Sequence, residues 1–328
     1  MSAGGHSPAT GVWMFPDRPA PYLVEVAAHV EAAGMAELWL GDEGPAREPF
    51  AVLAAAAGVT ERIRLGVAVT NPYVRHPALA ASTMLTVHEL SGGRAVLGVG
   101  AGGQMSLGPF GLRPQRPLAA VRDFVETVRA VARGQETGAY RPTDIAVSEA
   151  QVGVPMPVFV GARGEHLNRL ASEVADGAFV AGMPPFRFGE VLTWVRSRRD
   201  VAVALYPSAA MSDEAVERHR PEMIWSLADA PSSVRLAVGV DDARVQAAAV
   251  ALRGGDPGPA RRIVDDEVLD RLMLVGDPDE VGRRLAALVG EHSPASVGLA
   301  IVQEDLHAAV EAAGLAFEAM RRHLGAVA

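Results

Sequence analysis

The chain has 328 residues, a formal net charge of −9 and 49% hydrophobic residues. This length suits one (β/α)8 barrel or two ordinary domains, and the acidic balance argues against nucleic-acid binding, which needs clustered basic residues. The chain contains no cysteine, which excludes disulfides, thiolate nucleophiles and cysteine-bound metals. Because no apolar run could cross a membrane and residues 1–10 lack the order of a signal peptide, we expect a cytoplasmic protein without membrane partners.

The basic residues show a strong compositional bias. All 30 of them are arginine, and alanine is abundant. This bias is typical of a GC-rich genome, such as an actinobacterial one. The absence of lysine excludes Schiff-base catalysis and a lysine general base.

Short β-branched runs alternate with longer alanine-rich runs along the chain, which predicts repeated βα units. Strands are predicted at residues 11–15, 36–40, 63–69, 94–99, 157–160, 177–180, 201–205 and 297–302. Helices are predicted between them, from residues 22–33 to a closing helix at 306–323. Eight such units favour a closed TIM-like barrel over an open sheet, so we expect an α/β fold of the (β/α)8 type in one domain, residues 1–328.

Two segments interrupt this alternation. Residues 134–154 could form a short hairpin before the fifth strand. The segment of approximately 207–274 is too long for a plain loop. Its helical runs near residues 213–228 and 241–252 predict a helical insertion after the seventh strand.

In a (β/α)8 barrel, ligand-binding groups follow the C-terminal ends of the strands. The chain places these residues there, in strand order: Trp13 and Phe15; Asp42 and Glu43; Thr70 and Asn71; Gly100 and Gly102; Gly161, Ala162, Arg163 and Gly164; Gly182 and Met183. The aromatic side chains suit a ring wall. The glycine turn at 161–164 opens a helix, which predicts a phosphate site from free N–H groups and a helix dipole, although the pattern also serves plain strand-to-helix turns.

Asp42 and Glu43 are adjacent carboxyl groups at the start of a loop. Their repulsion would raise one pKa, which suits a shared proton donor; the alternative is a solvated loop start. We therefore expect Asp42→Asn to lower turnover and to leave cofactor affinity intact. The chain has no histidine pair with metal-ligand spacing and no Gly-x-Ser-x-Gly elbow, so we expect neither a catalytic metal nor a hydrolase triad.

Several motifs resemble those of the luciferase-like superfamily, in particular its deazaflavin-dependent branch, typified by methylenetetrahydromethanopterin reductase. The motifs are Thr70-Asn71-Pro72-Tyr73, Arg75-His76-Pro77, Ser91-Gly92-Gly93-Arg94 and Leu97-Gly98-Val99-Gly100-Ala101-Gly102. The resemblance extends over almost the whole chain. It implies an oxidoreductase that transfers a hydride between coenzyme F-420, an 8-hydroxy-5-deazaflavin, and a small organic substrate.

The resemblance also implies roles for individual residues. It implies a non-prolyl cis peptide at Ala68-Val69 behind the ring, and an acid at Asp42 near the ring and substrate. The other cofactor-binding residues that it implies are Thr70, Asn71, Gly100, Gly102, Gly161, Ala162, Arg163, Gly164, Gly182 and Met183. The chain departs from the family at Glu43, where many relatives have histidine, and at Gly103, where several have an acid. The proton would then come from Asp42, Glu43 or water, unless the reaction needs no acid.

Two alternatives use the same barrel. One is an FMN-dependent monooxygenase, and the other is a barrel that binds a flavin or deazaflavin without turnover. The Thr-Asn-Pro-Tyr and Arg-His-Pro motifs favour the deazaflavin. The resemblance further implies a homodimer, for which the alanine-rich runs 50–57 and 78–84 offer small-residue helix faces.

Overall fold

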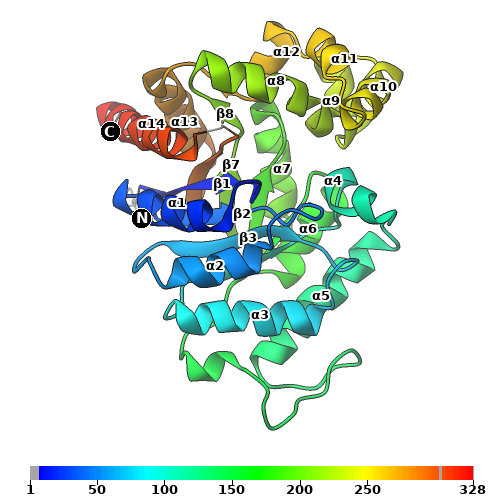
Figure 1. Ribbon diagram of the computed structural model, residues 1–328, viewed down its shortest axis with the longest axis vertical. Coiled ribbons are helices and arrows are strands. Elements are labelled where there is room, and N and C mark those ends of the chain that lie inside the picture. Colours follow the sequence, from blue (N-terminus) through cyan, green and yellow to red (C-terminus); the bar gives the residue numbers. More distant parts are fainter. Residues whose placement is uncertain (1–6, 303–304, 328) are drawn as a thin grey trace.

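The computed structural model describes residues 7–302 and 305–327 (Figure 1). Residues 1–6, part of the segment considered for a signal peptide, lie outside the described residues. The barrel strands are β1 (Ala9–Met14), β2 (Glu37–Leu40), β3 (Arg64–Thr70), β4 (Ala95–Val99), β5 (Val158–Gly161), β6 (Gly177–Ala181), β7 (Ala202–Tyr206) and β10 (Ser296–Ala300). All eight predicted strands are present, with small shifts at their ends.

These parallel strands close into a barrel in the spatial order β1-β10-β7-β6-β5-β4-β3-β2. Helices cover its outer surface, so the strands are buried on both faces, which explains their continuous apolar sequences. The predicted TIM-like (β/α)8 fold is therefore confirmed.

The helices around the barrel follow the predicted alternation. They are α1 (Ala20–Ala32), α2 (Pro49–Ala57), α3 (Pro77–Leu90), α4 (Gln104–Leu107), α5 (Pro117–Ala132), α6 (Glu165–Val174), α7 (Phe188–Val195), α13 (Pro278–His292) and α14 (Leu306–Val327), with 3-10 turns η1 (Gly108–Phe110), η2 (Glu149–Gln151) and η3 (Pro185–Arg187). Four of these helices, α2, α3, α5 and α13, begin with proline, whose fixed φ and missing N–H suit that position.

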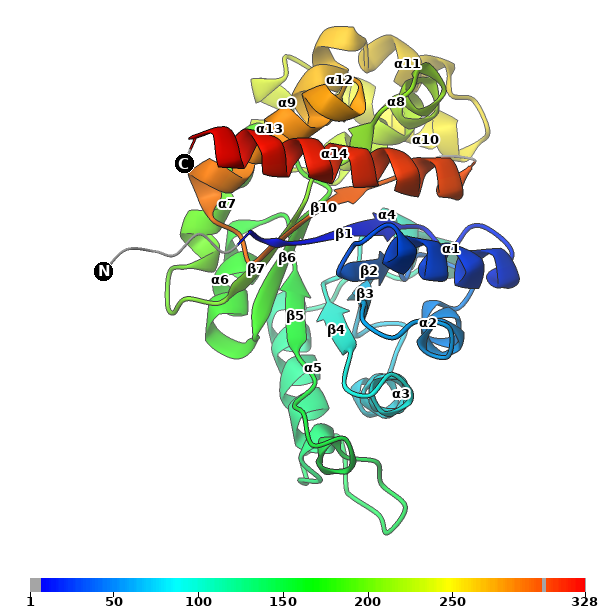
Figure 2. The same cartoon turned by 90° about the vertical axis from the view of Figure 1, so that its left-hand side faces the viewer.

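The predicted helical insertion lies between β7 and β10. It contains β8 (Ala209–Ala210), α8 (Asp213–Ala228), α9 (Ser232–Ala237), α10 (Asp242–Arg253), α11 (Gly258–Ile263), α12 (Asp266–Leu272) and β9 (Leu274–Val275). Figures 1 and 2 show these helices together at one end of the molecule, away from α3 and α5. They enclose a hydrophobic cluster of their own, which includes Ile224, Leu227 and Val245.

The predicted hairpin at residues 134–154 is wrong. The segment has one isolated antiparallel bridge, between Thr137 and Tyr140, and the 3-10 turn η2. It extends from the barrel beyond α5 (Figure 2) and leaves Ile145 94% exposed. Pro142 has no N–H to donate to a strand ladder, and Tyr140 and Val147 pack against the main hydrophobic core instead of forming the face of a hairpin.

A carboxylate lies inside the barrel, below the strand ends. Glu37 is 1% exposed and accepts hydrogen bonds from the Trp39 indole at 2.9 Å and the Tyr206 hydroxyl at 2.7 Å. Arg64 forms an ion pair with it. Burial and the Glu37 charge raise the pKa of Tyr206 well above its usual value. The hydroxyl therefore stays protonated and continues to donate its hydrogen bond to Glu37 inside the barrel.

Candidate active site

A cavity of about 380 Å³ lies where the barrel strands end, and α8 of the insertion covers one side of it. Its volume is in the range of small-molecule and cofactor pockets. The predicted site residues that line it are Glu43, Ala68, Val69, Gly100, Gly102, Gly161, Ala162, Arg163 and Gly182. Asp42, Thr70, Asn71, Gly164 and Met183 do not line it. The strand-end rule thus located the cavity, and the structure separates the residues that face it from those behind them.

The floor of the cavity is formed largely by backbone around Val69. The peptide bond Ala68-Val69 is cis, as the resemblance implied. A Cβ atom added at Gly98, Gly100 or Gly161 would lie 3.1, 2.8 or 2.6 Å from a Val69 methyl group. Larger residues at these glycines would collide with Val69. Glycine therefore allows the backbone at the ends of β4 and β5 to pack closely around Val69.

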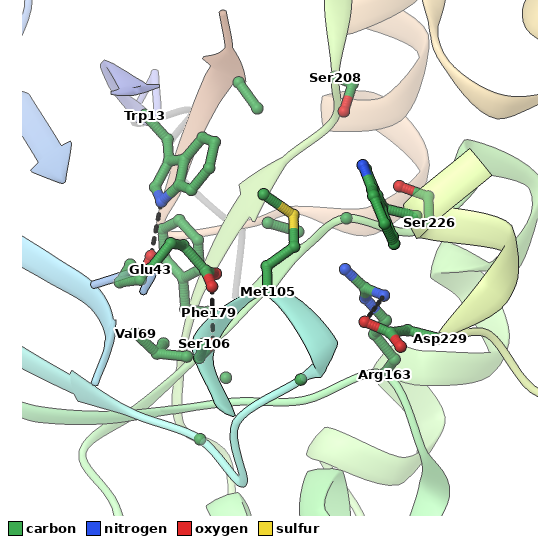
Figure 3. Close-up of a pocket in the computed structure, with 18 of the residues that line it drawn as sticks. Trp13, Glu43, Val69, Met105, Ser106, Arg163, Phe179, Ser208, Ser226 and Asp229 are labelled. Atoms are coloured by element: carbon green, nitrogen blue, oxygen red, sulfur yellow. Dashed lines mark hydrogen bonds and ion pairs between the residues drawn. The ribbon is translucent and has the colours of Figure 1, made fainter. Parts of the chain in front are cut away.

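Aromatic side chains form the wall beside this floor. The Trp13 indole donates a hydrogen bond of 2.6 Å to the Ala68 carbonyl, and its ring meets Phe15 edge to face at 4.6 Å between centroids. Phe179 of β6 also lines the cavity. Figure 3 shows Trp13, Val69 and Phe179 on the same side of the cavity. This side is apolar and suits a planar ring.

The predicted phosphate turn joins β5 to α6. Gly164 precedes α6 and provides no side-chain cap, so the first turn of this helix receives no capping acceptor from that residue. Arg163 lines the cavity, and its Nη1 lies 3.6 Å from Asp229 Oδ2 (Figure 3). Gly182 has φ of 64°, and a Cβ there would lie 2.9 Å from Arg163 Nη2, so glycine leaves room for the guanidinium.

Glu43, in the loop that follows β2, is an acidic group that faces the cavity. Burial raises its pKa from 4.5 to about 7, against the opposing effects of a Ser106 hydrogen bond and the Arg163 charge. The Ser106 hydroxyl donates to Glu43 Oε2 at 2.6 Å. A carboxyl group with this pKa is partly protonated near neutral pH, which suits general acid–base chemistry.

Asp42 has a different environment from its neighbour. It is 7% exposed and accepts hydrogen bonds from Thr70 Oγ1 at 2.6 Å and Arg75 Nε at 2.8 Å. Arg75 also pairs with Glu48 and lies over the Phe50 ring. Asp42 is therefore held in an ion-pair network behind the cavity wall.

Asn71 also lies behind the wall, in a turn. Its Oδ1 accepts from the backbone N–H groups of Tyr73 and Val74 at 3.1 and 3.2 Å. These bonds fix the loop that follows β3. Asn71 thus supports the floor without lining the cavity.

Sequence reasoning missed the side of the cavity that α8 provides. The residues from this helix and its C-terminal end are His219, Glu222, Met223, Trp225, Ser226 and Asp229. Their spacing of three and four places most of them on one helix face, but the sequence does not indicate that this face meets the barrel. Met105 and Ser106 of α4 complete the wall; Figure 3 shows Met105 between Glu43 and the Arg163–Asp229 pair.

Gly103 explains how α8 approaches the strand ends. A Cβ at this position would lie 2.9 Å from Asp229 Oδ2. The carboxylate of Asp229 therefore occupies the space that a side chain at position 103 would need. The sequence showed a missing acid at Gly103, but not that an acid from the insertion lies beside it.

Within residues 7–302 and 305–327, every helix is too short or too polar to span a lipid bilayer. In the same ranges, no three histidine, cysteine, aspartate or glutamate side chains are grouped so that they could hold a metal ion.

Comparison with known proteins identifies similar chains. The model of the luciferase-like monooxygenase family matches residues 2–291. The 5,10-methylenetetrahydromethanopterin reductase of Methanopyrus kandleri is 28% identical over 309 residues, which cover 85% of this chain and 88% of that protein. The protein of the same name from Archaeoglobus fulgidus is 30% identical over 285 residues, 81% of this chain and 85% of that one.

Structural comparison agrees with the sequence match. The coenzyme F-420-dependent tetrahydromethanopterin reductase of Methanopyrus kandleri superposes with a TM-score of 0.81 and 25% identity, over 94% of this chain and 98% of that chain. The family match covers residues 2–291, which include seven of the eight barrel strands and the insertion. The chain therefore belongs to the luciferase-like monooxygenase family.

Proposed function

We propose that this protein is a coenzyme F-420-dependent oxidoreductase that transfers a hydride between the deazaflavin ring and a small organic substrate. The observation that carries the proposal is the backbone floor at Val69, enclosed by glycines and flanked by aromatic rings. Similar proteins over most of the chain are named as reductases, one of them as F-420-dependent.

The residues present fit this coenzyme. The glycine floor and the Trp13 wall would hold a flat tricyclic ring. The turn 161–164, with Arg163 and the start of α6, would hold a phosphate, because N–H groups and a positive charge converge there. Gly182 also lines the cavity and would contact the chain between ring and phosphate.

When bound, the coenzyme would supply the hydride or accept it. Trp13, Phe15 and Phe179 would exclude water from the ring, and Glu43 would hold the proton that accompanies substrate reduction at its carboxyl oxygen. Ser106 would orient that carboxyl through its hydrogen bond. Asp42 would position the loop through Arg75 without contacting the ligand.

Titration of the purified protein tests the cofactor. Oxidised coenzyme F-420 and FMN are compared by fluorescence quenching. We expect clear preference for F-420. Micromolar FMN affinity without F-420 binding would instead support the FMN-dependent monooxygenase, and F-420 binding without turnover on any substrate would support a non-catalytic barrel.

We also propose that residues 1–328 form one domain and that two copies form a homodimer in the cytoplasm of a GC-rich, actinobacterial-type organism. Apolar side chains on the outer face of α3 support the dimer, since Leu79 and Leu90 are 68% and 58% exposed. A symmetric interface should bury more than about 1,000 Å² in total. Light scattering that gives a monomer mass at micromolar concentration would contradict this proposal.

A further inference from the structure

The charges around the cavity are unevenly balanced. Among the described residues that line the cavity, Arg163 is the one arginine. Three residues with carboxyl groups also line it: Glu43, Glu222 and Asp229. Asp229 already pairs with Arg163 at 3.6 Å. A negatively charged substrate would therefore find carboxylates on α8 and no unpaired cation among the described lining residues.

His219 of α8 is a polar group without a partner beside this cavity. It is fully buried within the protein, and neither ring nitrogen has a hydrogen-bond partner of normal geometry. Burial and the nearby Arg218 charge lower its pKa to about 4, against the opposing effect of the Ala209 backbone. The imidazole is thus neutral at pH 7, with one nitrogen to donate and one to accept.

The neighbouring residues on α8 extend this polar side. Ser226 and Glu222 line the cavity with His219, and Ser208 also lines it. Figure 3 shows Ser208 above Ser226. Burial raises the pKa of Glu222, while a Trp225 hydrogen bond and the Arg218 charge oppose the rise. Hydroxyl groups and a neutral imidazole recognise hydrogen-bonding groups without adding charge.

We propose that this cavity selects an uncharged substrate whose hydroxyl, carbonyl or amide group hydrogen-bonds to His219, and that it rejects phosphorylated or carboxylated substrates. This inference rests on the proposed function, since it assigns the α8 side of the cavity to the substrate and the Val69 side to the coenzyme. It separates this chain from relatives named F-420-dependent glucose-6-phosphate dehydrogenase, whose named substrate carries a phosphate. An unpaired buried polar group costs free energy, so a ligand that pairs His219 is favoured over one that does not.

Two probes of the same shape test this selectivity. Cyclohexanecarboxamide and cyclohexanecarboxylate differ in charge and are titrated calorimetrically, at neutral pH, into full-length protein saturated with coenzyme F-420. We expect the amide to bind about tenfold more tightly, because the carboxylate would meet Glu222 without an unpaired cation. Equal or tighter binding of the carboxylate, or no binding of either probe at millimolar concentration, would overturn the proposal.

Variants of His219 test whether this residue causes the preference for the amide over the carboxylate. His219→Phe keeps a ring and removes both nitrogens, so the amide should lose about tenfold in affinity while the carboxylate and coenzyme affinities stay unchanged. His219→Gln keeps a neutral donor and acceptor and should retain the preference. Retained preference in folded His219→Phe protein would show that another group selects the substrate.

The proposed function can fail separately from this inference. If coenzyme F-420 does not bind, the proposed function is wrong. The same probes, titrated into coenzyme-free wild-type and His219→Phe protein, still measure what His219 contributes to selectivity, since the comparison of the two proteins needs no coenzyme or turnover.

Discussion

The two sides of the cavity are built in different ways. The barrel side consists of strand ends, with glycine backbone around Val69 and aromatic rings beside it. The α8 side consists of polar side chains on one helix of the insertion, including His219 and Glu222. The barrel side therefore defines mainly a shape, with Glu43 and Arg163 as its charged groups, whereas the α8 side defines mainly hydrogen bonds and charge. Shape suits the binding of one fixed coenzyme, and a polar helix face suits discrimination among substrates.

The largest expected effect concerns which side supplies the proton. Glu43→Gln should lower turnover in the direction of substrate reduction by roughly 10²–10⁴-fold, the usual loss for a general acid. Coenzyme affinity should hardly change, because the glutamine is nearly isosteric. Steady-state kinetics and a fluorescence titration measure the two quantities.

Glu222→Gln is the matched control, since Glu222 is the cavity carboxyl group on α8 with a raised pKa. It should change turnover by less than about tenfold if the barrel side supplies the proton. If Glu222→Gln abolished turnover and Glu43→Gln did not, the roles of the two sides would be reversed. Asp42→Asn should act indirectly, through loss of the Arg75 ion pair.

The pH dependence of Glu43 gives the next expected effect. Its pKa is raised from 4.5 to about 7, so protonation of Glu43 stabilises the folded state. This contribution to the free energy of unfolding is lost as pH rises from about 4.5 through 7. Substrate reduction should likewise fall as pH rises through 7. Glu43→Gln should remove both trends. Wild-type and variant melting curves with the same pH profile would show that Glu43 does not titrate in this range.

A smaller effect is expected at the phosphate turn. A Cβ at Gly164 meets no atom within 4 Å, and its φ of −101° suits any residue, so Gly164→Val should fold normally. The branched side chain should nevertheless hinder an approaching phosphate and weaken coenzyme binding by about tenfold, the value of roughly one charged hydrogen bond. Gly164→Ala is the control, with a milder loss. Equal losses of stability and affinity would mean that the turn is structural only.

The smallest effect tests the contact between the two sides. Asp229→Asn removes the charge that pairs with Arg163, so the phosphate of the coenzyme should bind a few-fold more tightly at low salt. Arg163→Gln should have the opposite effect. Both differences should shrink as salt concentration rises. Weaker binding in Asp229→Asn would indicate that Asp229 itself contacts the coenzyme.

The sequence predicted the barrel side far better than the α8 side. Strands such as 94–99 have a continuous apolar pattern, and their ends place residues at one face of the barrel. The pattern did not distinguish Glu43, which faces the cavity, from Asp42, which Arg75 holds behind it. That difference depends on long-range contacts. Helix α8 was predicted correctly, but the direction of its polar face depends on packing between the insertion and the barrel.

The glycines around Val69 also have a consequence for directed evolution. Because the floor of the barrel side is made of main chain, point substitutions at Gly98, Gly100 or Gly161 would displace strands rather than reshape the cavity. A mutant library at these positions should yield mostly inactive protein. A library on α8 should instead alter the range of accepted substrates and keep the coenzyme, so the insertion is the part of this scaffold that can be redesigned.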